Sequence, residues 1–314
     1  MPDHPSLIRE GFRRVWHYQR VLWFIFCIGL VLGHFGASPV VHKLDRLDHS
    51  LYAHRLADVF DMGAFSSLSS DPEVNLFEAG GTSVALSLIF LVGMVFLTGG
   101  ILEAYRSGRK LTTREFFEAC GSYFWRWVRL IALMCIVLIP GMILLSLVWG
   151  QATSRMSNAA QEKAGFWILV VGATVLGILF MFVRLWFDMA QVRVVVEEEY
   201  GMIANAGRAF RLTIGNLGSL FWMYFRLALL GWAVLAGGLY VWAKMPPARF
   251  FSTWLILEFV ILFGYGIRLW QRACEMIWYQ RRYLASLSAS APAPVAPSST
   301  PLVMIAPPAG GLPS

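Results

Sequence analysis

The chain has 314 residues, of which 57% are hydrophobic and only 14% are charged, and its net charge is +7. A soluble domain is typically about half apolar and about a quarter charged, so this composition excludes an ordinary soluble fold and indicates a membrane protein. A basic balance can also indicate a nucleic-acid partner. Here the basic residues flank apolar runs, which favours anionic lipid headgroups instead, and we expect no nucleic-acid partner.

A helix needs about 20 mostly apolar residues to cross a bilayer, and six stretches of the chain qualify, the first of them only if residues 16–20 are helical and lengthen it. We therefore predict an all-α polytopic integral membrane protein whose six-helix domain occupies residues 1–285. The expected spans are residues 21–36, 83–105, 128–149, 165–187, 220–243 and 251–271. The first and shortest run also fits the apolar part of a signal peptide that ends near Ala37. The long amphipathic stretch before it favours an uncleaved first helix.

Lysine and arginine are unevenly distributed between the two sides that these spans define. With the N-terminus inside, 19 of the 26 basic residues lie on the inner side and 7 on the outer side. Loops rich in Lys and Arg stay in the cytoplasm. The distribution therefore predicts a bacterial inner-membrane protein with both termini in the cytoplasm.

The longest outer segment, residues 37–82, contains His42, His49 and His54 together with several acids. Imidazole and carboxylate groups bind zinc-like ions, but the spacing of these residues is not diagnostic. A helix over residues 42–60 at the membrane surface is the simpler interpretation. The four cysteines form no CxxC pair, and we expect them to pack as small apolar residues. We expect no metal site and no cofactor.

The last segment, residues 286–314, is rich in Ala, Pro and Ser. Such a composition cannot bury a core of its own. We therefore predict a disordered tail after the six-helix domain.

A Trp-x3-Arg pattern stands at the start of each odd-numbered span. Trp favours the headgroup boundary, and an Arg one helical turn later extends toward lipid phosphate. The pattern predicts interfacial anchors and three similar helical hairpins, which would form an internal repeat. The alternative is that any span starting at this interface attracts Trp and Arg. The three pairs are Trp16/Arg20, Trp125/Arg129 and Trp222/Arg226.

Two segments before odd-numbered spans have the pattern of cytoplasmic amphipathic helices. Thr112 and Glu115 form a capping box, which marks the start of the first of these helices. Each apolar stripe is expected either to pack under the bundle or to lie in the headgroup layer. The first stripe is Phe116, Cys120, Tyr123 and Trp127, and the second is Ile203, Ala206, Phe210 and Ile214.

Ionisable residues in or near the spans are the candidate functional residues. Glu258 lies well inside the sixth span, where a carboxylate is costly and indicates function by default. It is either a proton or cation site or a neutral group hydrogen-bonded to a neighbouring helix. A second group, near the cytoplasmic ends of the even-numbered spans, is expected to form a charge network connecting the hairpins or, alternatively, a polar gate or headgroup site. Its members are Glu103, Arg184, Asp188, Arg268 and Glu275.

The loop VVVEEEYGMIANAGRAFRLTIGN, residues 194–216, resembles a loop of uncharacterised bacterial six-helix membrane proteins. That family is related to the membrane domain attached to some glycerophosphodiester phosphodiesterases. The ending Trp278–Arg282 resembles the family's Y-x-x-R ending, and position 209, often Ser in the family, is Ala here. The resemblance covers most of residues 80–285 and implies a six-helix membrane fold without phosphodiesterase activity. The matching positions are Glu197, Glu198, Gly201, Ala206 and Asn216.

The sequence contains none of the signatures HExxH, Walker loop, GxSxG or GxGxxG, so we expect no enzyme. Few intramembrane charges, interfacial Trp and Arg, and amphipathic helices favour a membrane component that interacts with anionic lipids or with another membrane protein. The alternative is a permease-like transporter of a small solute, lipid or ion. It depends on Glu258 and on the Pro140–Gly141 step, because broken helices mark binding sites in some transporters.

Overall fold

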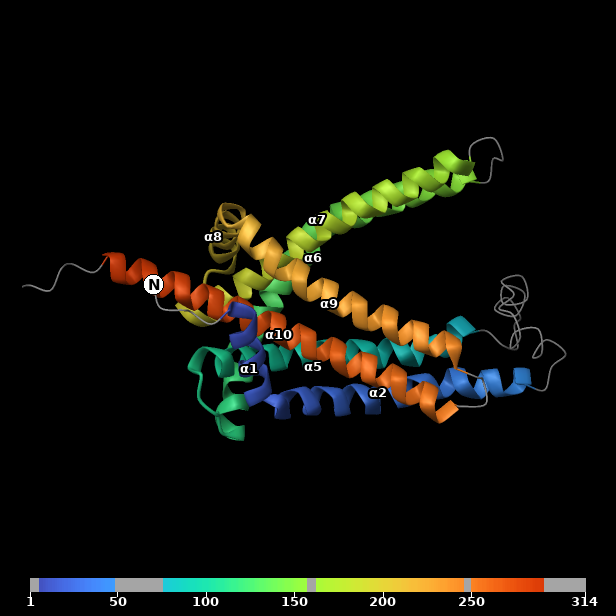
Figure 1. The fold of residues 1–314 in the computed structure, drawn as a ribbon, viewed down its shortest axis with the longest axis horizontal. Coiled ribbons are helices and arrows are strands. Elements are labelled where there is room, and N and C mark those ends of the chain that lie inside the picture. Colours follow the sequence, from blue (N-terminus) through green and yellow to red (C-terminus); the bar gives the residue numbers. More distant parts are fainter. Residues whose placement is uncertain (1–5, 49–75, 157–161, 246–249, 291–314) are drawn as a thin grey trace, which may run out of the picture.

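The computed structural model describes residues 6–48, 76–156, 162–245 and 250–290, and these ranges contain eight helices and no strand (Figure 1). Six of the helices, all except α1 and α8, are long and apolar enough to cross a membrane. The prediction of an all-α polytopic membrane protein with six spans is confirmed. The helices are α1 Leu7–His17, α2 Gln19–Asp48, α5 Leu76–Ser107, α6 Thr113–Met156, α7 Glu162–Glu197, α8 Met202–Gly215, α9 Leu217–Lys244 and α10 Phe250–Ser290.

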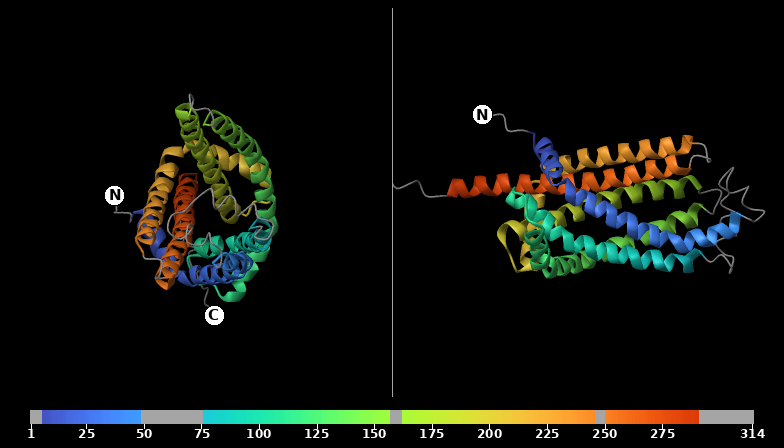
Figure 2. Two further views of the ribbon diagram at one scale, coloured as in Figure 1. Left: turned by 90° about the vertical axis from the view of Figure 1, so that its right-hand side faces the viewer. Right: turned by 90° about the horizontal axis from the view of Figure 1, so that it is seen from below.

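Consecutive long helices pair as the three predicted hairpins, α2 with α5, α6 with α7, and α9 with α10 (Figure 2). In Figure 1 the far ends of α6 and α7 diverge from the other four long helices. Only 6% to 28% of the residues in the most apolar window of each long helix are buried inside the protein. The exposed remainder is rich in aliphatic and aromatic side chains, which is the surface that a lipid bilayer requires.

The buried core is concentrated toward one end of the bundle, which we call the hub. There the end of α5 packs against the first turns of α6, and the end of α7 packs against α8. The end of α10 packs against α1 (Figures 1 and 2). Leu102, Trp127, Phe187 and Met276 are among its largest fully buried side chains. The hub therefore sets the relative positions of the three hairpins.

Glycine permits the closest helix contacts in the hub. A Cβ atom at Gly100 on α5 would lie 2.6 Å from the Sγ atom of Cys120 and 2.8 Å from the ring of Phe116, both on α6. A Cβ atom at Gly11 on α1 would overlap the Sγ atom of Cys274 on α10. Both cysteines are buried free thiols. These two cysteines act as the small packing residues that the sequence predicted, whereas Cys27 and Cys135 are exposed and do not pack in the interior as expected.

α6, α7 and α10 extend well past their predicted spans at the hub, and the extensions of α7 and α10 bury charged residues there. α6 begins at Thr113, so the first amphipathic segment and the third span form one helix. α7 continues beyond residue 187 to Glu197, and α10 continues beyond residue 271. Asp188 and Glu275 lie in these extensions and are only 7% and 1% exposed. The hydropathy of the sequence places the end of a span before such charged residues, because it contains no information about the side chains on other helices that contact them.

Two other predicted segments are described only in part. α10 ends at Ser290, so residues 286–290 of the predicted disordered tail are helical, whereas residues 291–314 lie outside the described residues. The helix expected over residues 42–60 is seen as far as Asp48, as a continuation of α2, with His42 exposed. His49 and His54 lie outside the described residues.

Candidate functional site

Two carboxyl groups and one phenol meet in the hub, each from a different helix. Asp188 is on α7, Tyr224 on α9 and Glu275 on α10, and all three are buried. The hydroxyl of Tyr224 lies 3.1 Å from Oδ2 of Asp188 and also donates to Oε1 of Glu275. A phenol has one hydrogen to donate, so it bonds to one of these carboxyl groups at a time. The Tyr224 hydroxyl thus joins the second hairpin to the third.

Arginine and glutamine side chains extend this cluster. Nε of Arg184 lies 3.6 Å from Oδ2 of Asp188, one helical turn away. Arg184 also donates a 3.0 Å hydrogen bond to Oε1 of Gln271, and Gln271 donates a 3.2 Å bond to Glu275. Arg272 lies 4.0 Å from the second oxygen of Asp188. Sequence reasoning did not identify Gln271 or Arg272 because only the fold brings them to Asp188.

The electrostatic balance of this cluster depends on several arginines. Oε2 of Glu275 is buried and has no hydrogen-bond partner among the described residues. Burying a carboxylate is costly unless nearby positive charge compensates it. Arg268 interacts electrostatically with Asp188 and Glu275 as well as with Arg184. The structure therefore brings together four of the five residues of the expected charge network.

Glu103, the fifth residue, belongs to a separate network. Its carboxylate lies 3.6 Å from Arg106 and accepts a 3.4 Å hydrogen bond from the hydroxyl of Tyr123. Arg106 in turn forms a 2.9 Å ion pair with Glu198 and donates a 2.6 Å bond to the carbonyl oxygen of Val195. Glu103 thus helps connect α5 to α6 and to the end of α7.

Residues of the 194–216 loop hold α8 against the hub. The carboxylate of Glu197 accepts a hydrogen bond from the hydroxyl of Tyr279 on α10. Gly201 directly precedes α8 as its N-cap residue. The indole nitrogen of Trp186 on α7 donates a 2.7 Å hydrogen bond to the carbonyl oxygen of Ala206. These contacts give the loop a structural role in positioning α8.

The Trp-x3-Arg residues point outward. Trp16, Trp125 and Trp222 are 65%, 68% and 51% exposed, although Trp is usually highly buried in soluble proteins. The second and third pairs each lie within one helix, and the guanidinium of Arg226 lies 4.9 Å from the ring centroid of Trp222. The first pair instead spans the junction of α1 and α2 at Tyr18, so its two members do not share one continuous helix. The three arginines, Arg20, Arg129 and Arg226, are exposed as well.

The two predicted apolar stripes face different surroundings. Cys120 and Trp127 of the first stripe are 0% and 1% exposed and pack in the hub. In the second stripe only Ala206 is fully buried, whereas Ile203 and Ile214 are 80% and 51% exposed. The first segment therefore packs under the bundle, as one of the two expected arrangements had it. The buried face of α8 is instead formed by Met202, Asn205, Ala206, Ala209 and Thr213, so the predicted second stripe is wrong except at Ala206.

The capping box at the start of α6 is present as predicted. The N–H group of Thr112 donates a 2.8 Å hydrogen bond to Oε2 of Glu115. The N–H group of Glu115 lies 3.3 Å from Oγ1 of Thr112 and donates to it. The reciprocal bonds satisfy two amides that the helix itself leaves unbonded.

Glu258 is half-buried on the apolar part of α10, 17 residues before Glu275 of the hub. It forms no hydrogen bond or ion pair in the described part of the chain, unlike Glu275 on the same helix. The hydrogen bond to a neighbouring helix that one interpretation required is not seen there. Glu258 remains a candidate for the transporter alternative.

No family model, curated protein or solved structure matches this chain. The candidate site therefore depends on the geometry of the hub and on the outward Trp and Arg residues.

Proposed function

We propose that this protein is a non-enzymatic component of the bacterial inner membrane that binds anionic phospholipids and, through its apolar helix faces, a neighbouring membrane protein. The hub and both termini lie on the cytoplasmic side in this proposal, in agreement with the distribution of Lys and Arg. The observation that carries the proposal is the outward orientation of the three Trp-x3-Arg pairs at the hub end of the bundle.

The arginines near the hub fall into two groups, those paired with carboxylates inside the protein and those exposed beside tryptophan. Arg106 and Arg193 pair with carboxylates inside the protein. Arg129 and Arg226 form no ion pair among the described residues, and the guanidinium of Arg226 lies over the ring of Trp222. Exposed arginines beside exposed tryptophans match the headgroup layer, where the indole lies at the boundary and the guanidinium reaches phosphate.

The test is native mass spectrometry of the protein extracted in lipid discs without detergent. We expect the wild type to retain a shell enriched in anionic phospholipid, together with any stable protein partner. The double variant Arg129→Gln/Arg226→Gln should lose this enrichment. The matched control Arg155→Gln/Lys244→Gln removes the same charge from the opposite end and should keep it. Equal lipid composition in all three proteins would refute the proposal.

The family resemblance supports the same class of protein. We propose that the chain belongs to the six-helix membrane family whose loop its residues 194–216 resemble. We also propose that its three hairpins descend from one repeated unit, which the Trp-x3-Arg pairs support.

One observation favours the second candidate, a permease-like transporter. Glu258 is a half-buried carboxylate in an apolar helix and forms no ion pair with the described residues, and a carboxylate in such a place is costly and indicates function by default. Flux across proteoliposome membranes distinguishes this function from lipid binding alone.

A further inference from the structure

A cavity of about 410 Å³ opens at the hub, between the α1–α2 junction and the start of α6. Its volume lies within the range of about 300 to 1,000 Å³ that is usual for ligand sites. Its wall includes residues from α1, α2, α5 and α6 and the connection before α6. His17, Arg20, Phe24, Lys110, Phe116 and Phe117 are among the residues that line it.

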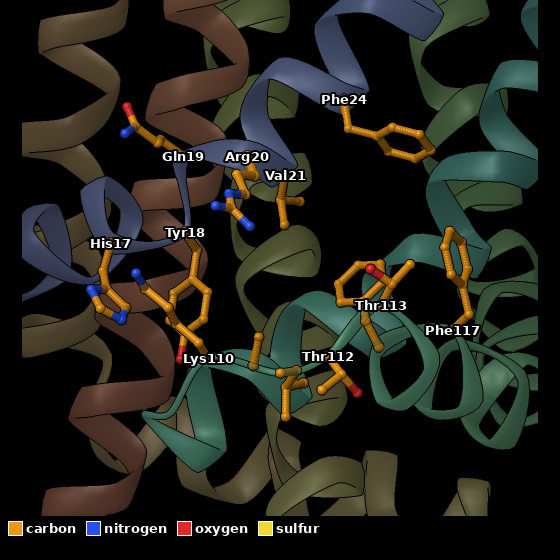
Figure 3. Close-up of a pocket in the computed structure, with 13 residues that line it drawn as sticks. His17, Tyr18, Gln19, Arg20, Val21, Phe24, Lys110, Thr112, Thr113 and Phe117 are labelled. Carbon is orange, nitrogen blue, oxygen red and sulfur yellow. The ribbon is translucent and has the colours of Figure 1, made fainter.

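One side of the cavity is basic. Figure 3 shows His17, Arg20 and Lys110 on this side. None of the described residues that line the cavity carries a carboxylate. Within the described residues, Arg20 and Lys110 form no ion pair, whereas the nearby Glu115 is bound by Arg109 at 2.8 Å. The two cations are therefore available to a ligand that carries negative charge.

The wall next to these cations is held in place. The hydroxyl of Tyr18 donates a 2.5 Å hydrogen bond to the carbonyl oxygen of Arg109, directly before Lys110. Burial raises the pKa of Tyr18 above its ordinary value, so the phenol stays neutral and adds no negative charge to the cavity. This bond connects the α1–α2 junction to the chain that leads into α6.

The other side of the cavity is apolar. Phe24 from α2 and Phe117 from α6 lie there, opposite the basic side chains (Figure 3). Both rings are more than 40% exposed, and the partly buried ring of Phe116 lines the cavity with them. A ligand that fits both sides must combine an anionic head with an apolar chain.

We propose that this cavity binds one anionic phospholipid molecule, with its phosphate between Arg20 and Lys110 and the start of its acyl chains along Phe24 and Phe117. The proposal rests on the proposed function and deepens it by assigning one defined site among the general lipid contacts. A soluble phosphate would use only the basic side, which is why the apolar side indicates a lipid.

The experiment uses native mass spectrometry of the full chain in detergent, titrated with phosphatidylglycerol or with phosphatidylcholine. We expect one phosphatidylglycerol to remain bound, with an affinity about tenfold or more above that for phosphatidylcholine. Arg20→Gln/Lys110→Gln should lower this affinity about tenfold or more, because two charge-assisted contacts are lost. Arg20→Lys/Lys110→Arg, which keeps both charges, should retain the lipid.

The matched control is Arg13→Gln/Arg114→Gln, which removes two exposed charges beside the cavity that do not line it. It should bind phosphatidylglycerol like the wild type, and an equal loss in the control would overturn the site. Displacement of the lipid by millimolar inorganic phosphate would also overturn it, because the site would then select free phosphate. Circular dichroism checks that each variant keeps its helix content.

The experiments can refute the cavity site and the general lipid-binding function independently of each other. If Arg129→Gln/Arg226→Gln loses the anionic shell but Arg20→Gln/Lys110→Gln keeps its bound lipid, the cavity assignment is wrong and the general function stands. If neither variant changes lipid binding, both proposals are wrong.

Discussion

The indole nitrogen of Trp270 on α10 donates a 2.8 Å hydrogen bond to the carbonyl oxygen of Ile8 on α1, 262 residues earlier in the chain. Trp186 on α7 makes the corresponding bond to α8. In both cases the Trp follows an Arg-Leu pair and fixes a short helix that precedes a membrane span. These bonds make α1 and α8 integral parts of the hub.

Replacing Trp270 with Phe should release α1 while keeping most of the apolar packing. The lost hydrogen bond should cost about 1 kcal/mol. We expect faster hydrogen–deuterium exchange confined to residues 7–17. The control is Trp278→Phe, because the indole of Trp278 donates a 3.3 Å hydrogen bond to the exposed Ser219 and not to α1. Unchanged exchange in α1 would show that the bond does not hold it.

Replacing Tyr224 with Phe should destabilise the contact between the second and third hairpins. The change removes the hydroxyl shared by Asp188 and Glu275 and leaves buried carboxyl oxygens with fewer partners. We expect a loss of about 2 kcal/mol in the free energy of unfolding. The measurement is unfolding in mixed micelles, followed by circular dichroism. Tyr240→Phe changes an exposed ring on the same helix and should have no effect.

Gly100→Val should disturb the packing of α5 on α6. The added atoms would meet Cys120 and Phe116 within 3 Å, and overpacking of this kind typically costs about 1 to 3 kcal/mol. Gly93→Val, on the same helix, is the control because nothing lies within 4 Å of its added Cβ atom. The measurement is the melting temperature of both variants in the same detergent. Equal melting temperatures would contradict the close contact at Gly100.

Glu258→Gln tests the transporter alternative. If the carboxyl group binds a proton or cation during transport, the variant should abolish pH-dependent flux in proteoliposomes while its fold is kept. Glu118→Gln removes an exposed carboxylate on α6 and should leave any flux unchanged. A pH response that Glu258→Gln does not alter would exclude the role of Glu258.

The sequence by itself determined the six spans, their pairing as hairpins and the capping box at Thr112. These features depend on local properties, namely the length of apolar runs and the hydrogen bonds between residues three apart. The outward Trp and Arg residues were also predictable, because an interface selects those residue types wherever a span begins.

Only the tertiary structure decided which charges meet. Tyr224 is an unremarkable residue in an apolar span, and its partners Asp188 and Glu275 lie 36 and 51 residues away. Glu103 is also a glutamate near the end of a span, yet it lies outside this cluster and accepts a hydrogen bond from Tyr123 on α6 instead. The physical reason is that a buried charge is stable only beside compensating groups, and the packing of distant helices decides which groups those are.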